Sequence, residues 1–293
     1  MGVIDEELQR LDRQSRGEVR KVPACLVRSA LFGIGVERRT FDEWTELPIL
    51  GEKWSLSYRG ETLGQDDFDV FQLLLHLYQP ASDIHATRHH LLKQLDRSRC
   101  RNSYGWLDGV LARLSSAGMR LSNGSRTIEL ERLVEYYGLE EETGELRISL
   151  SLSFAELLEI DVAFAAPDIL VRRLLAGNLT AWLFNFYDSH SGRQRHSDRL
   201  LWQLCGSRGE LKKFRIMLRQ SLGQLVACGL LKTAELSEGI VLTECKRAKN
   251  HASKENGKDK VAQEKNRQDE TQPASTVTGE SYKMRNSRGM VAI

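Results

Sequence analysis

One pattern of leucine, glycine and hairpin residues occurs twice in the chain, and it restricts the architecture most. The first copy, LARLSSAGMRLSNGSRTIEL, begins at Leu111, and the second, LGQLVACGLLKTAELSEGIVL, begins at Leu222. Both read L-x-x-L-x-x-x-G, which is typical of a helix that ends on a left-handed glycine. Both then predict a strand, a tight turn (Asn123-Gly124 or Glu238-Gly239) and a second strand. We therefore expect a duplicated architecture in which each half ends in a helix and a hairpin.

Further helical patterns precede each copy. In the first half, QDDFDVFQLLLHLYQP has acidic residues at its start and Pro80 at its end, and IHATRHHLLKQL follows from Ile84. Before them, WSLSYRGETL predicts a strand, a turn at Arg59-Gly60 and a short strand. In the second half, LTAWLFNFYDSH and SDRLLWQLC predict a long and a short helix. The predicted fold is mainly α with small β-hairpins (α+β), in two tandem winged helix-turn-helix domains.

The helix predicted after Ser207 has two different faces. Ser207 and Glu210 form an S-x-x-E capping box, so we expect the helix to begin at Arg208. Its apolar face comprises Leu211, Phe214, Leu218, Leu222 and Leu225, and its cationic line comprises Arg208, Lys212, Arg215 and Arg219. A cationic line is either a solvated face that aids solubility or a surface that enters a DNA groove. Cations in the first turn, where the helix dipole disfavours them, favour DNA contact.

Two sets of candidate DNA contacts follow. For base readout we predict Arg208, Lys212, Lys213 and Arg215. For phosphate contact we predict Ser207 and Arg219 on this helix, Arg193, Arg195 and Arg199 before it, Lys232, Lys246 and Arg247 on the hairpin after it, and Arg97, Arg99 and Arg101 at the corresponding turn of the first half. The segment SGRQRHSDR can instead be an ordinary basic loop. In the first half we expect weaker contact, because the helix after the turn offers Arg113 and little other cationic surface.

Composition excludes several classes of protein. No run reaches the ~18 to 20 apolar residues that a membrane span requires. The N-terminus lacks an apolar signal core, so we expect a cytoplasmic protein with no membrane partner. The five cysteines are scattered and form no C-x-x-C, which argues against both a disulfide framework and a zinc site. We therefore expect reduced thiols, no metal and no cofactor.

The chain divides into four predicted segments. We expect a flexible or helical arm over residues 1–23, a first winged-helix domain over 24–144 for dimerisation and backbone contact, a second over 145–247 for DNA recognition, and a disordered polar tail over 248–293. From Lys246 onward the chain holds eleven Lys or Arg and six Asp or Glu but almost no apolar residues. Such a segment cannot bury enough surface to offset its ordering entropy.

Four segments follow one another over about residues 26 to 247: RSALF (residues 28–32), YRGETLGQDDFDVFQLLL (residues 58–75), LARLSSAGM and WQLCGS. In these segments the chain resembles the TrfA family of plasmid replication initiators. The resemblance implies two winged-helix domains, binding to origin repeats called iterons, opening of an adjacent A+T-rich segment, recruitment of host initiator and helicase, and dimers that must become monomers. Family members carry a Q-L-x-L-F segment that engages the sliding clamp. Residues 1–27 contain none, so a clamp contact is doubtful for this chain.

Two other functions were weighed. A nicking enzyme would use a histidine pair, a metal and a tyrosine, and His85 and His89 are four residues apart on a predicted helix. Tyr104 or Tyr136-Tyr137 would supply the nucleophile, but no acid is suitably placed, the H-x-H strand motif is absent, and no G-x-x-x-x-G-K-[ST] loop occurs. We therefore predict that the chain is not an enzyme. The remaining alternative is a winged-helix transcriptional repressor without initiation activity, because one fold serves both functions.

Overall fold

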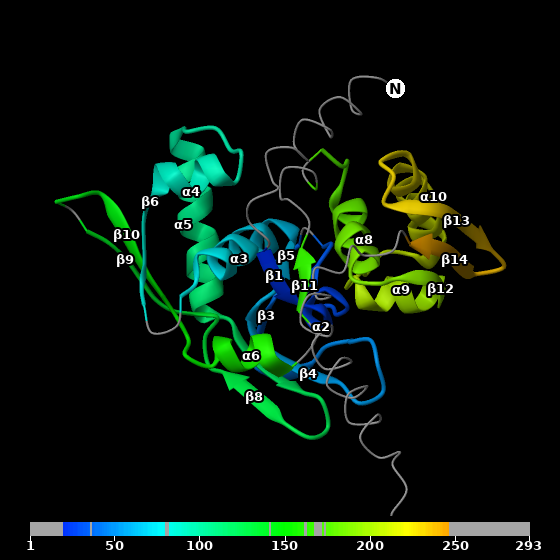
Figure 1. Cartoon of the computed structure of the whole chain (residues 1–293), viewed down its shortest axis with the longest axis horizontal. Coiled ribbons are helices and arrows are strands. Elements are labelled where there is room, and N and C mark those ends of the chain that lie inside the picture. The colour runs from blue at the N-terminus through cyan, green and yellow to red at the C-terminus, as the bar shows by residue number, and fades with distance from the viewer. Residues whose placement is uncertain are drawn as a thin grey trace, which may run out of the picture. The chain divides into compact units, whose positions relative to one another are not determined.

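The computed structural model describes residues 20–245 except residues 36, 80–81, 141, 161–162, 167–171 and 173. Most of the predicted N-terminal arm and the whole predicted tail lie outside these described residues, as do the candidate phosphate contacts Lys246 and Arg247. The order of elements is shown in Figure 1.

Residues 20–166 alternate between strands and helices. In chain order they are β1 (Arg20–Pro23), α2 (Ala24–Val27), β2 (Phe32–Gly33), β3 (Thr40–Glu46), β4 (Ser55–Glu61), β5 (Leu63–Gly64), α3 (Gln65–Leu77), β6 (Ile84–Thr87), α4 (Arg88–Gln94), α5 (Arg101–Ser116), β7 (Gly118–Ser122), β8 (Thr127–Leu130), β9 (Val134–Leu139), β10 (Glu145–Leu150), α6 (Phe154–Ile160) and β11 (Ala163–Ala166). The later residues form α8 (Asn178–Asp188), β12 (Gly192–Ser197), α9 (Asp198–Leu204), α10 (Leu211–Ala227), β13 (Leu231–Ser237) and β14 (Ile240–Cys245).

These strands form five sheets within the described part of the chain. β1 pairs with β11, β2 pairs with β5 in parallel, and β3-β4-β7-β8 form an antiparallel sheet. The other two sheets, β6-β10-β9 and β12-β14-β13, have the same order: the strand before a pair of helices lies at one edge, and the last strand of the following hairpin lies in the middle. The two sheets thus share a strand order, but the hairpin of the first sheet is β9–β10 and not the predicted β7–β8.

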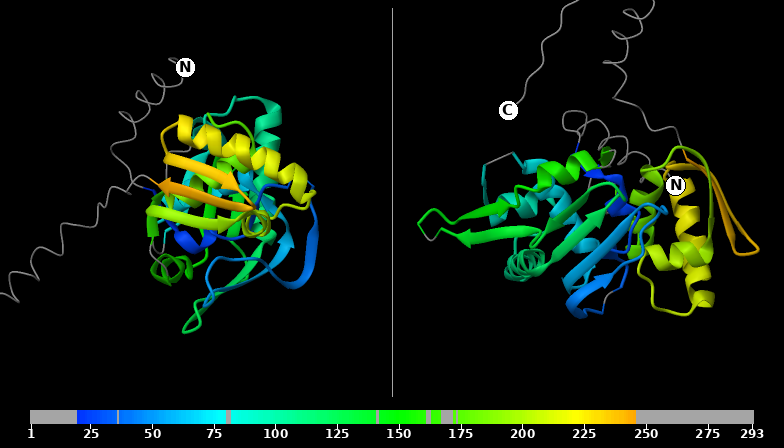
Figure 2. Two further views of the ribbon diagram at one scale, coloured as in Figure 1. Left: turned by 90° about the vertical axis from the view of Figure 1, so that its right-hand side faces the viewer. Right: turned by 90° about the horizontal axis from the view of Figure 1, so that it is seen from below.

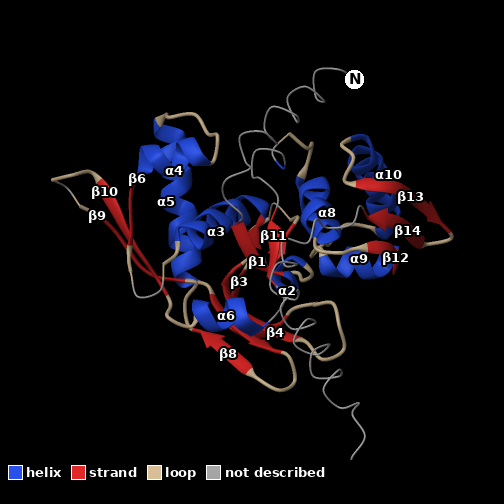
Figure 3. Ribbon diagram, in the orientation of Figure 1, coloured by secondary structure: helices blue, strands red, loops and turns tan. Residues whose placement is uncertain are grey.

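The expectation of a mainly helical chain with two tandem winged-helix domains is wrong. Strands run through the whole described chain in five sheets, so the fold is α+β (Figure 3). The hairpin predicted to close the first half, β7–β8, instead pairs with β4 in the four-stranded sheet. The hairpin that occupies the equivalent place is β9–β10, and its second strand does carry a period-two signal in Leu146, Ile148 and Leu150 that the sequence prediction did not use.

Four local predictions also differ from the structure. β4 runs through the turn predicted at Arg59-Gly60, and Ile84–Thr87 is strand β6, so that helix begins only at Arg88. The segment SGRQRHSDR, for which an ordinary basic loop was one alternative, contains strand β12. α10 begins at Leu211 instead of Arg208. The Trp202 indole N–H donates to the Gly209 carbonyl at 2.9 Å, and this contact accompanies the non-helical path of residues 207–210.

Several other predictions are confirmed. α3 begins at Gln65 and ends before Pro80, and α8 and α9 lie where the sequence predicted helices. The β13–β14 turn has positive φ at both Glu238 (50°) and Gly239 (77°), as a tight two-residue hairpin requires. Gly229 has φ 76° and follows the C-terminal end of α10, as predicted. Gly118, predicted to end a helix in the same way, is the first residue of strand β7.

Two apolar clusters form the interior. The first draws on residues from Val22 to Ile160, and the second on residues from Leu179 to Cys245. The predicted apolar face of α10 is confirmed, since Phe214, Leu218, Leu222 and Leu225 are all buried in the second cluster. Figure 2 shows α10 lying across the three-stranded sheet that completes this cluster. The four predicted segment boundaries stay a prediction.

The acidic start of α3 is a buried ion-pair centre. The Asp67 carboxylate is fully buried and accepts from Arg38 Nη1 at 2.7 Å, Arg113 Nη2 at 2.7 Å and the Gly64 backbone N–H at 2.7 Å. A buried carboxylate is tolerated only when charge and hydrogen bonds compensate its lost hydration. Asp67 therefore joins the start of α3 to α5 and to the segment before β3.

A second buried carboxylate follows two residues later. Asp69 pairs with Arg172, and Arg172 also donates to the Gln65 side-chain oxygen at 2.6 Å. The Gln65 amide in turn donates to the Phe32 carbonyl at 2.6 Å. All three polar side chains are almost fully buried. The G-Q-D-D-F-D string thus has a structural purpose: it anchors α3 to segments on both sides of it in the sequence.

Hydrogen bonds at the α9–α10 turn and at the end of α8 connect residues 28–34 to the second half. The Ile34 N–H donates to the Cys205 carbonyl at 2.9 Å, and the Arg28 guanidinium donates to Ser189 Oγ at 2.9 Å. Gly206 has φ 65°, and a Cβ there would lie 3.5 Å from the Gly33 Cα. A glycine is needed at this turn because of both its positive φ and the close approach of the other backbone.

The substitution Asp67→Ala tests the ion-pair centre. It leaves Arg113, whose side chain is 18% exposed, without its carboxylate, so we expect a loss of about 3 to 5 kcal/mol in the free energy of unfolding. Urea denaturation followed by circular dichroism measures this change. The matched control is Asp66→Ala, because Asp66 is 51% exposed and its ion pair with Arg97 is worth at most about 1 kcal/mol. Equal losses for the two variants would contradict this assignment.

Candidate nucleic-acid interface

The cationic line before and along α10 lies mostly at the surface. Arg208, Lys212 and Arg219 are exposed, and no described carboxylate forms an ion pair with them. Lys213 faces Glu210 at 3.8 Å, with both side chains more than 70% exposed. A surface pair of this kind contributes at most about 1 kcal/mol. Four of the five cations on this segment are therefore available to an anionic partner.

Arg215 differs from its neighbours because it is paired with Asp198. Its Nε donates to the Asp198 carboxylate, whose side chain is 5% exposed, whereas the Arg215 side chain is 43% exposed. Asp198 begins α9, and its backbone N–H donates to the Gly239 carbonyl at 2.8 Å in the β13–β14 turn. The pair thus joins α9, α10 and the hairpin turn. Base readout by Arg215 stays a prediction. It requires the guanidinium to bond a DNA base while it stays paired with Asp198.

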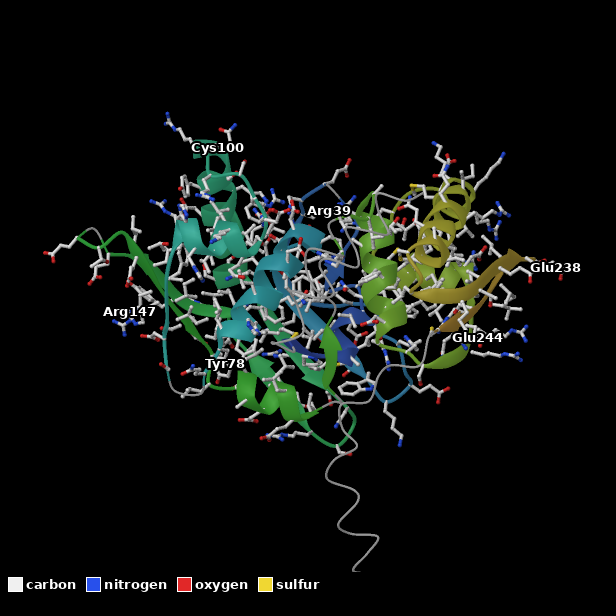
Figure 4. The ribbon with its side chains drawn as sticks, turned by 45° about the horizontal axis from the view of Figure 1, so that its top comes forward. Arg39, Tyr78, Cys100, Arg147, Glu238 and Glu244 are labelled. Atoms are coloured by element: carbon white, nitrogen blue, oxygen red, sulfur yellow. The ribbon has the colours of Figure 1, made fainter. Side chains whose placement is uncertain are left out.

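The predicted phosphate contacts around α10 fall into two groups. Arg193 and Arg195 on β12 and Arg199 on α9 are exposed. Lys232 is exposed but donates to Glu244 at 2.9 Å, and this hydrogen bond holds the pKa of Glu244 below its ordinary value. Among the described residues of the β13–β14 hairpin, Lys232 is the one cation, and the acids are Glu235, Glu238 and Glu244. Figure 4 labels Glu238 and Glu244 on this hairpin. The described hairpin therefore favours phosphate less than α10 does. Ser207 lies half-buried in the α9–α10 turn.

The turn between α4 and α5 carries the candidates from the first half. Arg97 stacks over the Trp106 ring at 3.5 Å and donates to Asp66 at 2.8 Å, so it is engaged within the chain. Arg99 and Arg101 are exposed and flank Cys100 in the sequence. Cys100 is labelled in Figure 4. Hydrogen bonds from Ser103 and Ser98 lower the pKa of the Cys100 thiol to about 7. Arg99 and Arg101 form no such pair among the described residues, and the weaker contact expected at this turn stays a prediction.

The outward face of α10 also holds exposed residues that the sequence pattern did not single out. Ile216 is 52% exposed and Met217 is 43% exposed, and Gln220 is exposed one turn after Ile216. A search for cations alone could not find them. The signal was present in the spacing, since Ile216 and Gln220 follow Lys212 at intervals of four residues.

The considered histidine pair does not form a metal centre in the described part of the chain. His85 lies in strand β6 and His89 lies in α4, so they do not share a helix face. No group of three or more His, Cys, Asp or Glu residues is placed to hold an ion among residues the structure describes. Likewise, no described helix is both long and apolar enough to cross a bilayer.

Removing Arg215 tests its role in joining α9, α10 and the hairpin. Arg215→Ala leaves the buried Asp198 carboxylate without its guanidinium, so we expect the free energy of unfolding to fall by about 1 to 3 kcal/mol. Arg219→Ala, on the same helix, removes an exposed cation and should change it by less than about 0.5 kcal/mol. Urea titrations of both variants give the comparison. Equal stability of the two would show that the Arg215 pair contributes nothing to the fold.

Comparison with known proteins identifies a shared fold. No family model and no curated protein matches the chain. Two crystal structures of domains 2 and 3 of RctB are similar to it, with TM-scores of 0.52 and 0.50 and identities of 14% and 12%. Each match covers 76% of this chain and 96% of the RctB chain. The chain therefore has the fold of RctB domains 2 and 3.

Proposed function

We propose that this chain is a plasmid replication initiator that binds double-stranded iteron DNA through α10. The observation that carries the proposal is the run of exposed cations at the surface of the second cluster, with Arg208 just before α10 and Lys212, Lys213 and Arg219 along it. Cations with no strong internal partner release counterions from DNA when they neutralise phosphates, and this release drives binding. A helix is also the element that fits the major groove.

The fold and the sequence give independent support. RctB, whose domains 2 and 3 have this fold, is a replication initiator. The segments RSALF and YRGETLGQDDFDVFQLLL resemble the TrfA family of plasmid initiators. The buried roles of Gln65, Asp67 and Asp69 explain physically why the fold needs the polar residues of that string. Fold alone does not decide function, so the proposal also depends on α10.

The proposed mechanism is non-covalent and uses no cofactor. α10 reads the repeat, while Arg99 and Arg101 in the first half add backbone contact and that half also dimerises. Binding of several monomers distorts the duplex, the adjacent A+T-rich segment opens, and host initiator and helicase are recruited. In this scheme the chain supplies binding energy and position, and it performs no bond-making chemistry.

A transcriptional repressor is the alternative, and a plasmid experiment separates the two. The gene is placed with its own origin region on a plasmid that has no other initiator. An initiator is required for maintenance of that plasmid, whereas a repressor is dispensable for maintenance and changes only expression. Loss of the plasmid when the gene is deleted, with rescue in trans, supports initiation. Normal maintenance without the gene refutes it.

Lys212→Ala and Arg219→Ala should weaken DNA binding in different ways. Lys212 is a predicted base reader, so its loss should cost about 1 to 3 kcal/mol on the specific site and reduce discrimination against other sequences. Arg219 is a predicted phosphate contact, so its loss should reduce the slope of log K against log salt by about one and leave discrimination unchanged. Gel-shift titrations at several salt concentrations measure both quantities.

Lys53→Ala is the control for these two variants, because Lys53 is an exposed lysine between β3 and β4 and none of the predicted DNA contacts lies in that segment. It should bind as the unaltered protein does. Unaltered affinity, discrimination and salt slope for both Lys212→Ala and Arg219→Ala would remove α10 from the interface.

A further inference from the structure

The outward face of α10 has a row of three residues at its centre. The helix buries Phe214, Leu218, Leu222 and Leu225. At 100° per residue, the direction opposite this face is occupied by Ile216, with Lys212 one turn before it and Gln220 one turn after it. All three are exposed, and half of the Ile216 side chain is open to solvent. Lys212, Ile216 and Gln220 form what we call the outward row.

The apolar member of this row lies outside the described apolar core. Ile216 belongs to neither apolar cluster, whereas its neighbour Met217 lines a cleft together with Trp202 and Ile34. One turn beyond Gln220, Gly223 is also exposed, and a Cβ there would meet nothing within 4 Å. A mid-helix glycine is less favourable than alanine by about 1 kcal/mol, and no neighbour in the chain requires it. The C-terminal end of the row is thus open to a surface that approaches the helix closely.

The chemistry of the row matches one kind of base pair. In the major groove an A·T pair presents the N7 acceptor and N6 amino donor of adenine and the 5-methyl group of thymine. A glutamine amide can bond adenine N6 and N7 together, and an aliphatic side chain can pack on the thymine methyl. A G·C pair offers no methyl group to an aliphatic side chain and two acceptors in place of the adenine pattern.

We propose that Ile216 and Gln220 are specificity-determining residues that read A·T pairs in the bound repeat. Ile216 packs against a thymine 5-methyl group, and Gln220 accepts from adenine N6–H while it donates to adenine N7. Lys212 supplies positive charge at the N-terminal end of the same row. This assignment rests on the proposed function, since it requires α10 to lie in a major groove.

Base analogues that delete single atoms provide the test. The full chain first selects its preferred site from a pool of random-sequence duplexes. In that site each thymine is then replaced, one at a time, by deoxyuridine, which lacks only the methyl group, and each adenine by 7-deazaadenine, which lacks N7. Dissociation constants are measured for the unaltered protein, Ile216→Ala and Gln220→Ala. The controls are Val226→Ala and Gln203→Ala, which alter an exposed aliphatic residue and an exposed glutamine away from the row.

We expect each variant to lose its response to one base replacement. At one thymine, removal of the methyl group raises the dissociation constant of the unaltered protein about fourfold. The dissociation constant of Ile216→Ala does not change on that replacement. At one adenine, removal of N7 raises the dissociation constant of the unaltered protein at least about fivefold. The dissociation constant of Gln220→Ala does not change on that replacement. Val226→Ala and Gln203→Ala keep both responses.

Two results would overturn the assignment. If the unaltered protein is insensitive to every replacement, or if Ile216→Ala and Gln220→Ala keep its full sensitivity at every position, these residues do not read A·T pairs. Sequence-specific binding would still stand in that case, so the proposed function would survive. Selection of no preferred sequence by the unaltered protein would instead refute both proposals together.

Discussion

The buried carboxylate of Asp67 is the interaction on which the arrangement of the first half depends. One side chain accepts from the start of its own helix, from Arg113 on α5 and from Arg38 before β3, so three segments distant in sequence meet at one charge. The cost of burying a carboxylate makes this arrangement selective, because any packing that separates Asp67 from its donors leaves an unpaired charge in the interior. Asp69 extends the same principle to Arg172, which lies beyond the first apolar cluster.

The second half repeats this device at the candidate interface. Asp198 is buried at the start of α9 and pairs with Arg215, while its backbone bonds the β13–β14 turn. One cation of α10 is thereby used to fix the helix, and the remaining cations are displayed on a helix with a fixed position. A contact surface built on a rigid element loses less conformational entropy on binding than one built on a loop. The Ile34–Cys205 hydrogen bond adds a connection between the α9–α10 turn and residues 28–34.

Local signals were sufficient for part of this structure. The acidic start of α3, the apolar period of α10 and the Glu238-Gly239 turn were predicted from the sequence because each depends on residues close together in the chain. The strand order of the sheets was not predicted, because the place of β4 between β3 and β7 depends on residues that are distant in the sequence. The same reason applies to the site. The acidic partners of Arg215 and Arg97 lie 17 and 31 residues away, so the sequence pattern could not separate these engaged cations from Lys212 and Arg219. It also overlooked Ile216 and Gln220, since exposure of an uncharged residue depends on which face the helix buries.

The central claim is that the outward face of α10 contacts DNA, and lysine acetylation followed by mass spectrometry tests it most directly. The protein is labelled alone, with its selected duplex and with a scrambled duplex at the same salt concentration. The account predicts that the selected duplex protects Lys212 and Lys213, while the exposed Lys53 is labelled equally in all three samples. Full labelling of Lys212 and Lys213 in a saturated complex, with protection elsewhere, would contradict it.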